Sequence, residues 1–237
     1  MHSQDENKIN REFFDTISPV YDKKTAADWK SPSAVAAVVK PLLGAKTKLL
    51  DFGVGTGNLL DALDVCVIQS NIFAVDVSSG MVEVCRKKFP AADIRQIKAT
   101  CEISTFAWPK FDLIVSSGVF EYIERIDSLI CTLKGFLNQV GELIFTYQPI
   151  IMHHAKQCDR TTKTFWTVKF AGSIGLKIAR DIESIQFRWH THEIHDFCRA
   201  ASLEVIQHES FVAFYDGADT TAPPRIYNIV RARLNSI

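Results

Sequence analysis

The 237-residue sequence lacks the features that mark several large classes of protein. It carries no net charge, with 27 Lys and Arg against 27 Asp and Glu, whereas binding nucleic acid through its phosphates requires a strongly basic surface. No run approaches the ~18 apolar residues of a membrane span, and Glu142 interrupts the stretch 140–152. The six cysteines form no CxxC pair, so we expect reduced and mostly buried thiols. These absences predict a cytoplasmic protein of enzyme size, with no nucleic acid and no membrane as partner.

Short apolar runs alternate with helical patterns between residues 48 and 147. The runs that we expect to form strands are Lys48–Phe52, Asn71–Val77, Asp93–Ile97, Phe111–Ser116 and Glu142–Tyr147. Continuous apolar runs are typical of strands that helices cover on both faces of a parallel sheet. We therefore predict an α/β fold with a doubly wound, mostly parallel sheet of about seven strands and helices on both faces.

The C-terminal third departs from this alternation. Residues 191–201 show helical spacing and begin with Thr191, which we expect to cap the helix. Two strand-like runs, 203–215 and 226–234, follow without a helix between them, so they should pair antiparallel. The segment 149–187 is far longer than a plain connection of about 2–6 residues. We expect this segment to contain helices of its own and to lie over one edge of the sheet.

A glycine-rich turn follows the first predicted strand, with the pattern Asp51-x-Gly53-x-Gly55-x-Gly57. Such glycines allow a sharp turn and leave room for a ligand to lie against bare backbone. The pattern is not the dinucleotide fingerprint GxGxxG, because Asn58 or Leu60 stands where the last glycine is needed. It is not a phosphate-binding P-loop either, since no Gly-Lys-Ser/Thr follows.

Further motifs accompany this turn at the expected spacing. Asp51 and the alternating glycines resemble the first motif of class I S-adenosylmethionine-dependent methyltransferases, in the subgroup that acts on small molecules. The runs 75–81 and 111–123 resemble the motifs at the second and fourth strands of that family. The pattern Phe14-Asp15-x5-Tyr21-Asp22 resembles its N-terminal lid segment. The resemblance covers roughly residues 10 to 147 and implies a Rossmann-like methyltransferase fold with S-adenosylmethionine as cofactor.

The resemblance also implies roles for individual residues. Asp51 would orient the amino end of the methionine moiety, and Asp76 would accept both ribose hydroxyls. The residues implied to contact the cofactor are Tyr21, Asp51, Gly53, Gly55, Asp76, Val77, Met81, Thr100, Cys101 and Ser116. The sequence departs from the family at Thr100 or Cys101, where an acid often holds the adenine amino group. A second departure is Tyr122, which stands where many small-molecule members have a histidine.

Methyl transfer from S-adenosylmethionine to a small organic acceptor is the function that this pattern predicts. Candidates for taking the acceptor's proton are His153, His154, Tyr147 and Glu121. The histidines follow the fifth predicted strand, where ligands of such sheets collect. No metal is expected, because His190, His192 and His195 straddle a helix start and their side chains diverge.

We expect the whole chain, 1–237, to form a single methyltransferase domain. Residues 1–45 would form a helical lid segment, and 149–187 an inserted substrate cap that shapes the acceptor pocket. Two alternatives remain open at this stage. One is methylation of a protein or RNA, and the other is a module that binds S-adenosylmethionine without catalysis.

Overall fold

The computed structural model of the protein describes residues 3–25, 29–65, 71–154, 157–171, 177–215 and 223–235, without the side chains of 3–7, 24, 165–171 and 177–181. The helices are α1 Ser3–Ile17, η1 Ser18–Val20, α2 Tyr21–Thr25, α3 Ser31–Val39, η2 Lys40–Leu42, α4 Asn58–Leu63, α5 Ser79–Lys88, η5 Thr100–Thr105, η6 Phe120–Tyr122, α6 Ile126–Lys134 and α7 Thr191–Ala200. The strands are β1 Leu49–Phe52, β2 Ile72–Asp76, β3 Asp93–Gln96, β4 Phe111–Ser116, β5 Leu137–Tyr147, β6 Thr161–Ala171, β7 Lys177–Phe187, β8 Leu203–Phe214 and β9 Arg225–Leu234.

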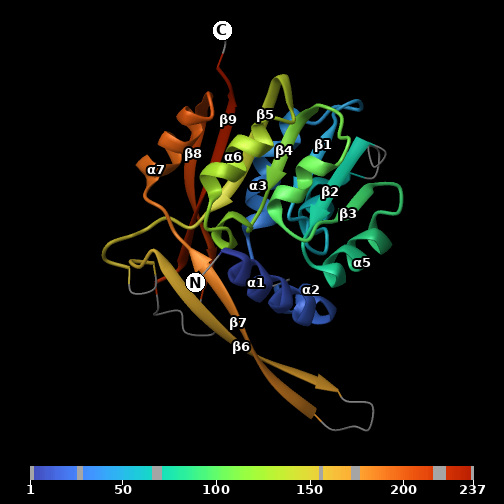
Figure 1. Cartoon of the computed structure of the whole chain (residues 1–237), viewed down its shortest axis with the longest axis vertical. Helices are drawn as coiled ribbons and strands as arrows, with labels where there is room; N and C mark the ends of the chain where they lie inside the picture. The colour runs from blue at the N-terminus through green and yellow to red at the C-terminus, as the bar shows by residue number, and fades with distance from the viewer. Residues whose placement is uncertain are drawn as a thin grey trace.

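The predicted doubly wound sheet is confirmed. Seven strands pair in the order β3-β2-β1-β4-β5-β9-β8 (Figure 1). Strands β1 to β5 are mutually parallel, whereas β9 runs antiparallel to both β5 and β8. The order reverses between β1 and β4, and this is where the carboxyl ends of parallel strands leave a crevice for ligands.

Two hydrophobic cores lie on opposite faces of the sheet because successive strand residues point to opposite sides. Leu50 and Ile114 face one core, which the apolar sides of α6 and α7 complete. Leu49 and Leu113, one position earlier on each strand, face the other core with α3, α4 and α5. Covered strands of this kind explain the continuous apolar runs in the sequence.

The segment 149–187 differs from the prediction, because its long elements are strands rather than helices. Strands β6 and β7 pair antiparallel from Thr161↔Phe187 to Ala171↔Lys177 and form a separate two-stranded sheet. Figure 1 shows this hairpin extending away from the main sheet. The two runs of 11 residues pair with each other along one edge and do not join the main sheet.

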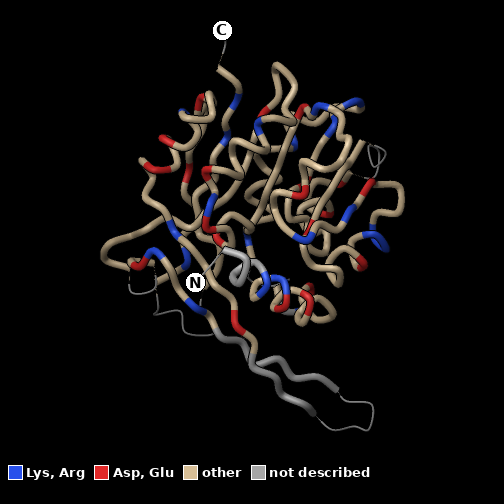
Figure 2. The backbone as a smooth tube through the Cα atoms, in the orientation of Figure 1, with Lys and Arg blue, Asp and Glu red and all other residues tan. Residues whose placement is uncertain are grey.

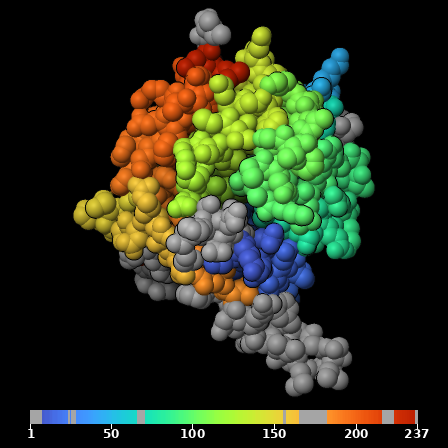
Figure 3. Space-filling model, viewed as in Figure 1, coloured from blue at the N-terminus to red at the C-terminus, as the bar shows by residue number. Residues whose placement is uncertain are grey.

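The base of the hairpin holds the N-terminal helix. The Asn10 side chain on α1 accepts a hydrogen bond from the backbone N–H of Ile185 at 2.8 Å and donates to its carbonyl at 3.1 Å. Asn10 also donates to the carbonyl of Tyr122 at 3.1 Å, which ties α1 to the loop after β4. Figure 3 shows the N-terminal segment, in blue, packed beneath the green part of the chain and beside the orange strand.

The C-terminal elements match their predictions except at one cap. Helix α7 begins at Thr191, but its N-cap is His190, whose backbone N–H donates to Glu193 at 2.8 Å. Glu193, at the third helical position, thus accepts the backbone N–H of the N-cap residue, and Thr191 is the first residue of the helix rather than its cap. Strands β8 and β9 pair antiparallel as expected.

Along the described backbone, Lys and Arg residues are interspersed with Asp and Glu residues (Figure 2). Among the helices that the structure describes, none is long and apolar enough to cross a membrane.

The expectation of mostly buried thiols is wrong for the described cysteines, because Cys101 and Cys131 are exposed and Cys158 is half-buried. Cys66 lies outside the described residues.

Candidate functional site

A glycine turn between β1 and α4 forms the floor of the candidate site. Gly53 and Gly55 have φ angles of +79° and +56°, a region that favours glycine. A side chain at Gly53 would collide with Val119, whose Cγ2 lies 2.3 Å from the ideal Cβ position. At Gly55 no atom lies within 4 Å of the corresponding Cβ position, so the backbone there faces open space. The turn therefore packs tightly on one side and stays bare on the other.

The open side of the turn belongs to a cavity of about 940 Å³, including its mouth. Residues after β1, β2 and β4 line it, together with residues from the N-terminal segment. The cavity thus occupies the crevice that the strand order predicts.

Two carboxylates from neighbouring strands line this cavity. Asp51 on β1 is 1% exposed, and its Oδ2 atom has no hydrogen-bond partner among the described residues. Burial, and secondarily the carboxylate of Asp76, raise the pKa of Asp51 to about 8. An unpaired buried acid beside an open cavity is suited to a cationic ligand group, which would supply the missing partner.

Asp76, at the end of β2, supports the glycine turn as well as lining the cavity. Its Oδ2 accepts the backbone N–H of Gly55 and its Oδ1 accepts that of Ser78, each at 2.8 Å. Burial raises the pKa of Asp76 to about 6, although these backbone donors oppose the shift. Each oxygen keeps a further lone pair, so the carboxylate is able to accept hydroxyl groups from a ligand.

The N-terminal segment supplies the wall opposite the glycine turn. Asn10 and Phe14 from α1, Tyr21 from α2, and Trp29 line the cavity from this side. We call residues 3–25 the cover; Trp29 lines the cavity on the same side but lies outside this range. The Phe14 ring meets the ring of Tyr122 edge-on at 4.9 Å between centroids. Aromatic rings on this wall exclude water from the cavity beside them.

Most residues that the family resemblance assigns to the cofactor are brought together here. The cavity is lined by Tyr21, Asp51, Gly53, Gly55, Asp76, Val77, Met81 and Thr100. Cys101 is exposed and is not among the lining residues. Ser116 is buried and donates its hydroxyl to the carbonyl of Phe52 at 2.8 Å, so it supports the strand while its neighbour Ser117 lines the cavity. Contact of these residues with a cofactor stays a prediction.

The four candidate proton acceptors lie outside the cavity lining. His153 is exposed, and the ring of His154 hydrogen-bonds the carbonyl of Pro224 at 2.9 Å. Tyr147 is buried, with its hydroxyl 3.1 Å from the ring of His208. Glu121 is 1% exposed and precedes Tyr122, which does line the cavity. A catalytic role for these residues stays a prediction, and Glu121 is the one of the four that is next in sequence to a lining residue.

Glu121 belongs to a buried polar network that the sequence did not indicate. Tyr227 donates its hydroxyl to Glu121 at 2.9 Å and accepts from Gln148 at 2.7 Å. Gln148 in turn accepts from Arg188, which is fully buried, at 2.9 Å. Burial raises the pKa of Glu121 to about 7, while the hydroxyl of Tyr227 and the charge of Arg188 oppose the shift.

Sequence reasoning missed several lining residues. Asn10 and Trp29 stand in no motif, and only the fold brings them to the cavity. Phe14 and Tyr122 stood within recognised motifs, and their aromatic character was the available signal. Of the described residues, no group of three or more His, Cys, Asp or Glu is placed to hold a metal ion. His190 and His192 stack on each other, while His195 turns to His208.

The chain is similar to known methyltransferases in fold and, over part of its length, in sequence. A sequence family described as "Methyltransferase domain" matches residues 50–145, which include the glycine turn and both cavity carboxylates. Over these residues the chain is similar in sequence to methyltransferases. An S-adenosylmethionine-dependent methyltransferase from Clostridium acetobutylicum has the same fold, with a TM-score of 0.64, 17% identity and coverage of 93% of this chain and 98% of that one.

Two curated methyltransferases are similar over part of their length. Malonyl-[acyl-carrier protein] O-methyltransferase of Paenibacillus sp. is 34% identical over 42% of this chain and 38% of its own. The ubiquinone/menaquinone biosynthesis C-methyltransferase UbiE of Campylobacter jejuni is 29% identical over 50% of this chain and 54% of its own. The chain therefore spans less than two thirds of the length of each of these relatives.

S-adenosylmethionine is the methyl donor of this class, and the methyltransferase cavity fits it on two observations. The unpaired Oδ2 of Asp51 offers a buried acceptor for the cofactor's ammonium group. The bare backbone at Gly55 leaves the space that a side chain would fill. Together they form a charged anchor and an open floor within one cavity.

Proposed function

We propose that this protein transfers the methyl group of S-adenosylmethionine to a small organic acceptor. The observation that carries the proposal is the unpaired buried carboxylate of Asp51 beside the bare turn at Gly55. The family match over residues 50–145 supports the same conclusion independently. A cavity lined by the cover on one side and by the sheet on the other keeps water from the reacting groups.

Individual residues take defined roles in this proposal. Asp51 holds the ammonium group of the cofactor, and Asp76 accepts the ribose hydroxyls while it fixes the glycine turn. Val77 and Thr100 flank the adenine, with Tyr21 closing the cavity from the cover. The cofactor supplies an activated methyl group on a sulfonium. What remains for the protein is to align the acceptor in line with that methyl group and to remove a proton where the acceptor has one.

Glu121 is the proton acceptor that we favour among the candidates. Its pKa of about 7 places it near the optimum for a general base at neutral pH. The network through Tyr227 fixes one carboxylate oxygen, and the other oxygen has no partner among the described residues. His153, His154 and Tyr147 remain alternative proposals; like Glu121 they lie outside the cavity lining, but unlike Glu121 none of them is next in sequence to a lining residue.

The nature of the acceptor is also a proposal. The relatives are named for a malonyl group on acyl-carrier protein and for ubiquinone or menaquinone biosynthesis. We propose a small organic acceptor, free or attached to a carrier, in the cytoplasm. The segment 149–187 acts indirectly as a cap in this proposal, because β7 holds the α1 helix that lines the cavity.

Labelled S-adenosylmethionine tests the proposal directly. Isothermal titration with the unlabelled cofactor first establishes binding, and incubation with methyl-labelled cofactor and a metabolite extract then reveals a labelled small molecule. Asp51→Asn serves as the control that should weaken both signals at pH 8. Binding without transfer to any metabolite or carrier protein would support the alternative of a non-catalytic module, and label in RNA would support the other alternative.

A further inference from the structure

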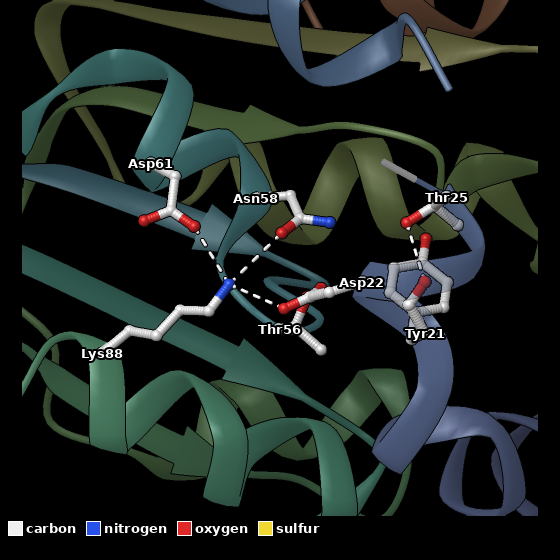
Figure 4. A network of polar contacts seen from close by, with 7 residues as sticks. All are labelled: Tyr21, Asp22, Thr25, Thr56, Asn58, Asp61 and Lys88. Carbon is white, nitrogen blue, oxygen red and sulfur yellow. Dashed lines mark hydrogen bonds and ion pairs between the residues drawn. The ribbon is translucent and has the colours of Figure 1, made fainter. Parts of the chain in front are cut away.

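A cluster of polar side chains joins the cover to the glycine turn (Figure 4). Asp22 on α2 accepts a hydrogen bond from the hydroxyl of Thr56, which lies inside the glycine turn and is 1% exposed. The Nζ atom of Lys88, the last residue of α5, lies 2.9 Å from the other oxygen of Asp22. Asp22 is therefore bonded to two structural elements of the methyltransferase domain at once.

Lys88 makes a second ion pair that does not involve the cover. Its Nζ lies 2.9 Å from Oδ2 of Asp61 and donates to Asn58 at 3.3 Å, both on α4 (Figure 4). One ammonium group thus bridges α2, α4 and α5. The pair with Asp22 crosses between cover and domain, whereas the pair with Asp61 lies within the domain.

The position of this cluster relative to the cavity gives it a consequence for the cofactor. Tyr21, the neighbour of Asp22, lines the cavity from the cover, and Thr56 lines it from the turn. A cofactor in the cavity lies between these two walls. How readily it leaves then depends on how firmly Asp22 joins them.

We propose that Asp22 and Lys88 are positioning residues that fasten the cover to the glycine turn and thereby slow release of the cofactor. This inference rests on the proposed function. Asp22 is 42% exposed and Lys88 28% exposed in their side chains, so the attachment lies at the surface and is open to screening by salt. It is a weak and reversible fastening, as exchange of a cofactor in every turnover requires.

The cover has other attachments that should keep it folded when Asp22 is changed. Asp15 accepts hydrogen bonds from Ser78 at 2.7 Å and from the backbone of Gly80 at 3.2 Å, at the start of α5. Asn10 holds the cover to β7 and to Tyr122. Loss of the charge at Asp22 should therefore loosen one end of the cover and leave the rest in place.

The test compares Asp22→Asn with Asp61→Asn in the full chain. Both variants remove one carboxylate charge at the same distance from Lys88, but only the first acts on the cover. Release of S-adenosylhomocysteine is followed by stopped-flow tryptophan fluorescence, since Trp29 lines the cavity. We expect Asp22→Asn to speed release about three- to fivefold and Asp61→Asn to change it less than about 1.5-fold, in line with one exposed ion pair.

Ionic strength provides a readout that a merely structural role would not move. Release from the wild type should accelerate as salt rises from about 0.05 to 0.5 M, and this dependence should be weaker in Asp22→Asn. If Asp22→Asn does not fold, Lys88→Met and the salt series on the wild type answer the same question. Equal release rates in wild type and Asp22→Asn, or equal acceleration in both Asn variants, would overturn the inference. Failure of the wild type to bind the cofactor would instead contradict the proposed function.

Discussion

The charge of Asp51 makes cofactor binding depend on pH in a way that can be calculated. With a pKa of about 8 in the free protein, about nine in ten Asp51 side chains are protonated at pH 7. Pairing with an ammonium group requires the ionised form. Binding of S-adenosylmethionine at pH 7 should therefore release about 0.9 proton from this side chain. Affinity should fall about tenfold for each pH unit below 8.

The sign of this dependence follows from the direction of the shift. Burial raises the pKa of Asp51, so the protonated form is the favoured one in the free protein and the ionised form is favoured in the complex. Affinity accordingly rises with pH up to about 8. Above that value the cofactor's own α-amino group, with a pKa of about 8, loses its charge, so affinity should peak rather than level off.

Asp51→Asn tests this reasoning without changing the shape of the side chain. At pH 8 it should weaken binding by about 1.5–3 kcal/mol, the usual contribution of a hydrogen bond to a charged group. Near pH 6 the variant and the wild type should converge, because the wild-type carboxyl is then mostly neutral. Calorimetry in two buffers of different ionisation enthalpy counts the protons released. A proton release that persists in Asp51→Asn, or an affinity independent of pH in the wild type, would refute the assignment.

Four further variants test other parts of the site. Asp76→Ala should weaken cofactor binding by about 2–3 kcal/mol in calorimetry, because the ribose hydroxyls lose a charged acceptor; unchanged affinity would contradict that role. Gly55→Val should abolish binding, because its side chain enters the open space above the turn and because a φ of +56° strains any residue other than glycine; tight binding in calorimetry would contradict the use of this space by the cofactor. The raised pKa of Glu121 makes its ionisation destabilising as pH rises, so above pH 7 Glu121→Gln should be more stable than the wild type by up to about 3 kcal/mol. Thermal unfolding should show this difference disappear as the pH falls towards 4.5. His153→Ala should leave kcat within about twofold, because its side chain is exposed and outside the cavity, whereas a fall of about 10²–10⁴ would restore it as the general base.

The parallel half of the fold could be predicted because short stretches of sequence indicate each of its elements. Each buried strand is a short apolar run, and each is followed by a turn and an amphipathic helix. The turn at Gly53 and Gly55 needs positive φ angles, which left a visible pattern in the sequence. Asp51 and Asp76 stand at strand ends, where the topology collects ligand-binding groups. Local sequence patterns therefore predict the cavity residues that we propose to contact the cofactor.

The hairpin β6–β7 could not be recognised in the same way. The length of 149–187 suggested helices, but length alone does not separate a helical cap from a long two-stranded ribbon. The partner of each strand residue in this ribbon lies up to 26 positions away, as for Thr161 and Phe187. No short-range pattern at β6 reveals that pairing, which is why period-2 segments outside a sheet core are easily misassigned.

The walls of the cavity depend on contacts between residues that are even further apart in the sequence. Asn10 lines the cavity and is held by Ile185, 175 residues along the chain. Without the hairpin, the buried amide of Asn10 would lose both backbone partners at Ile185, and a buried amide without partners is costly. β7 is therefore one of the elements that hold the helix carrying Phe14 in place beside the cavity. The residues that we propose to bind the cofactor are thus recognisable from local sequence, whereas Asn10 in the cavity wall depends on a hairpin distant in the chain.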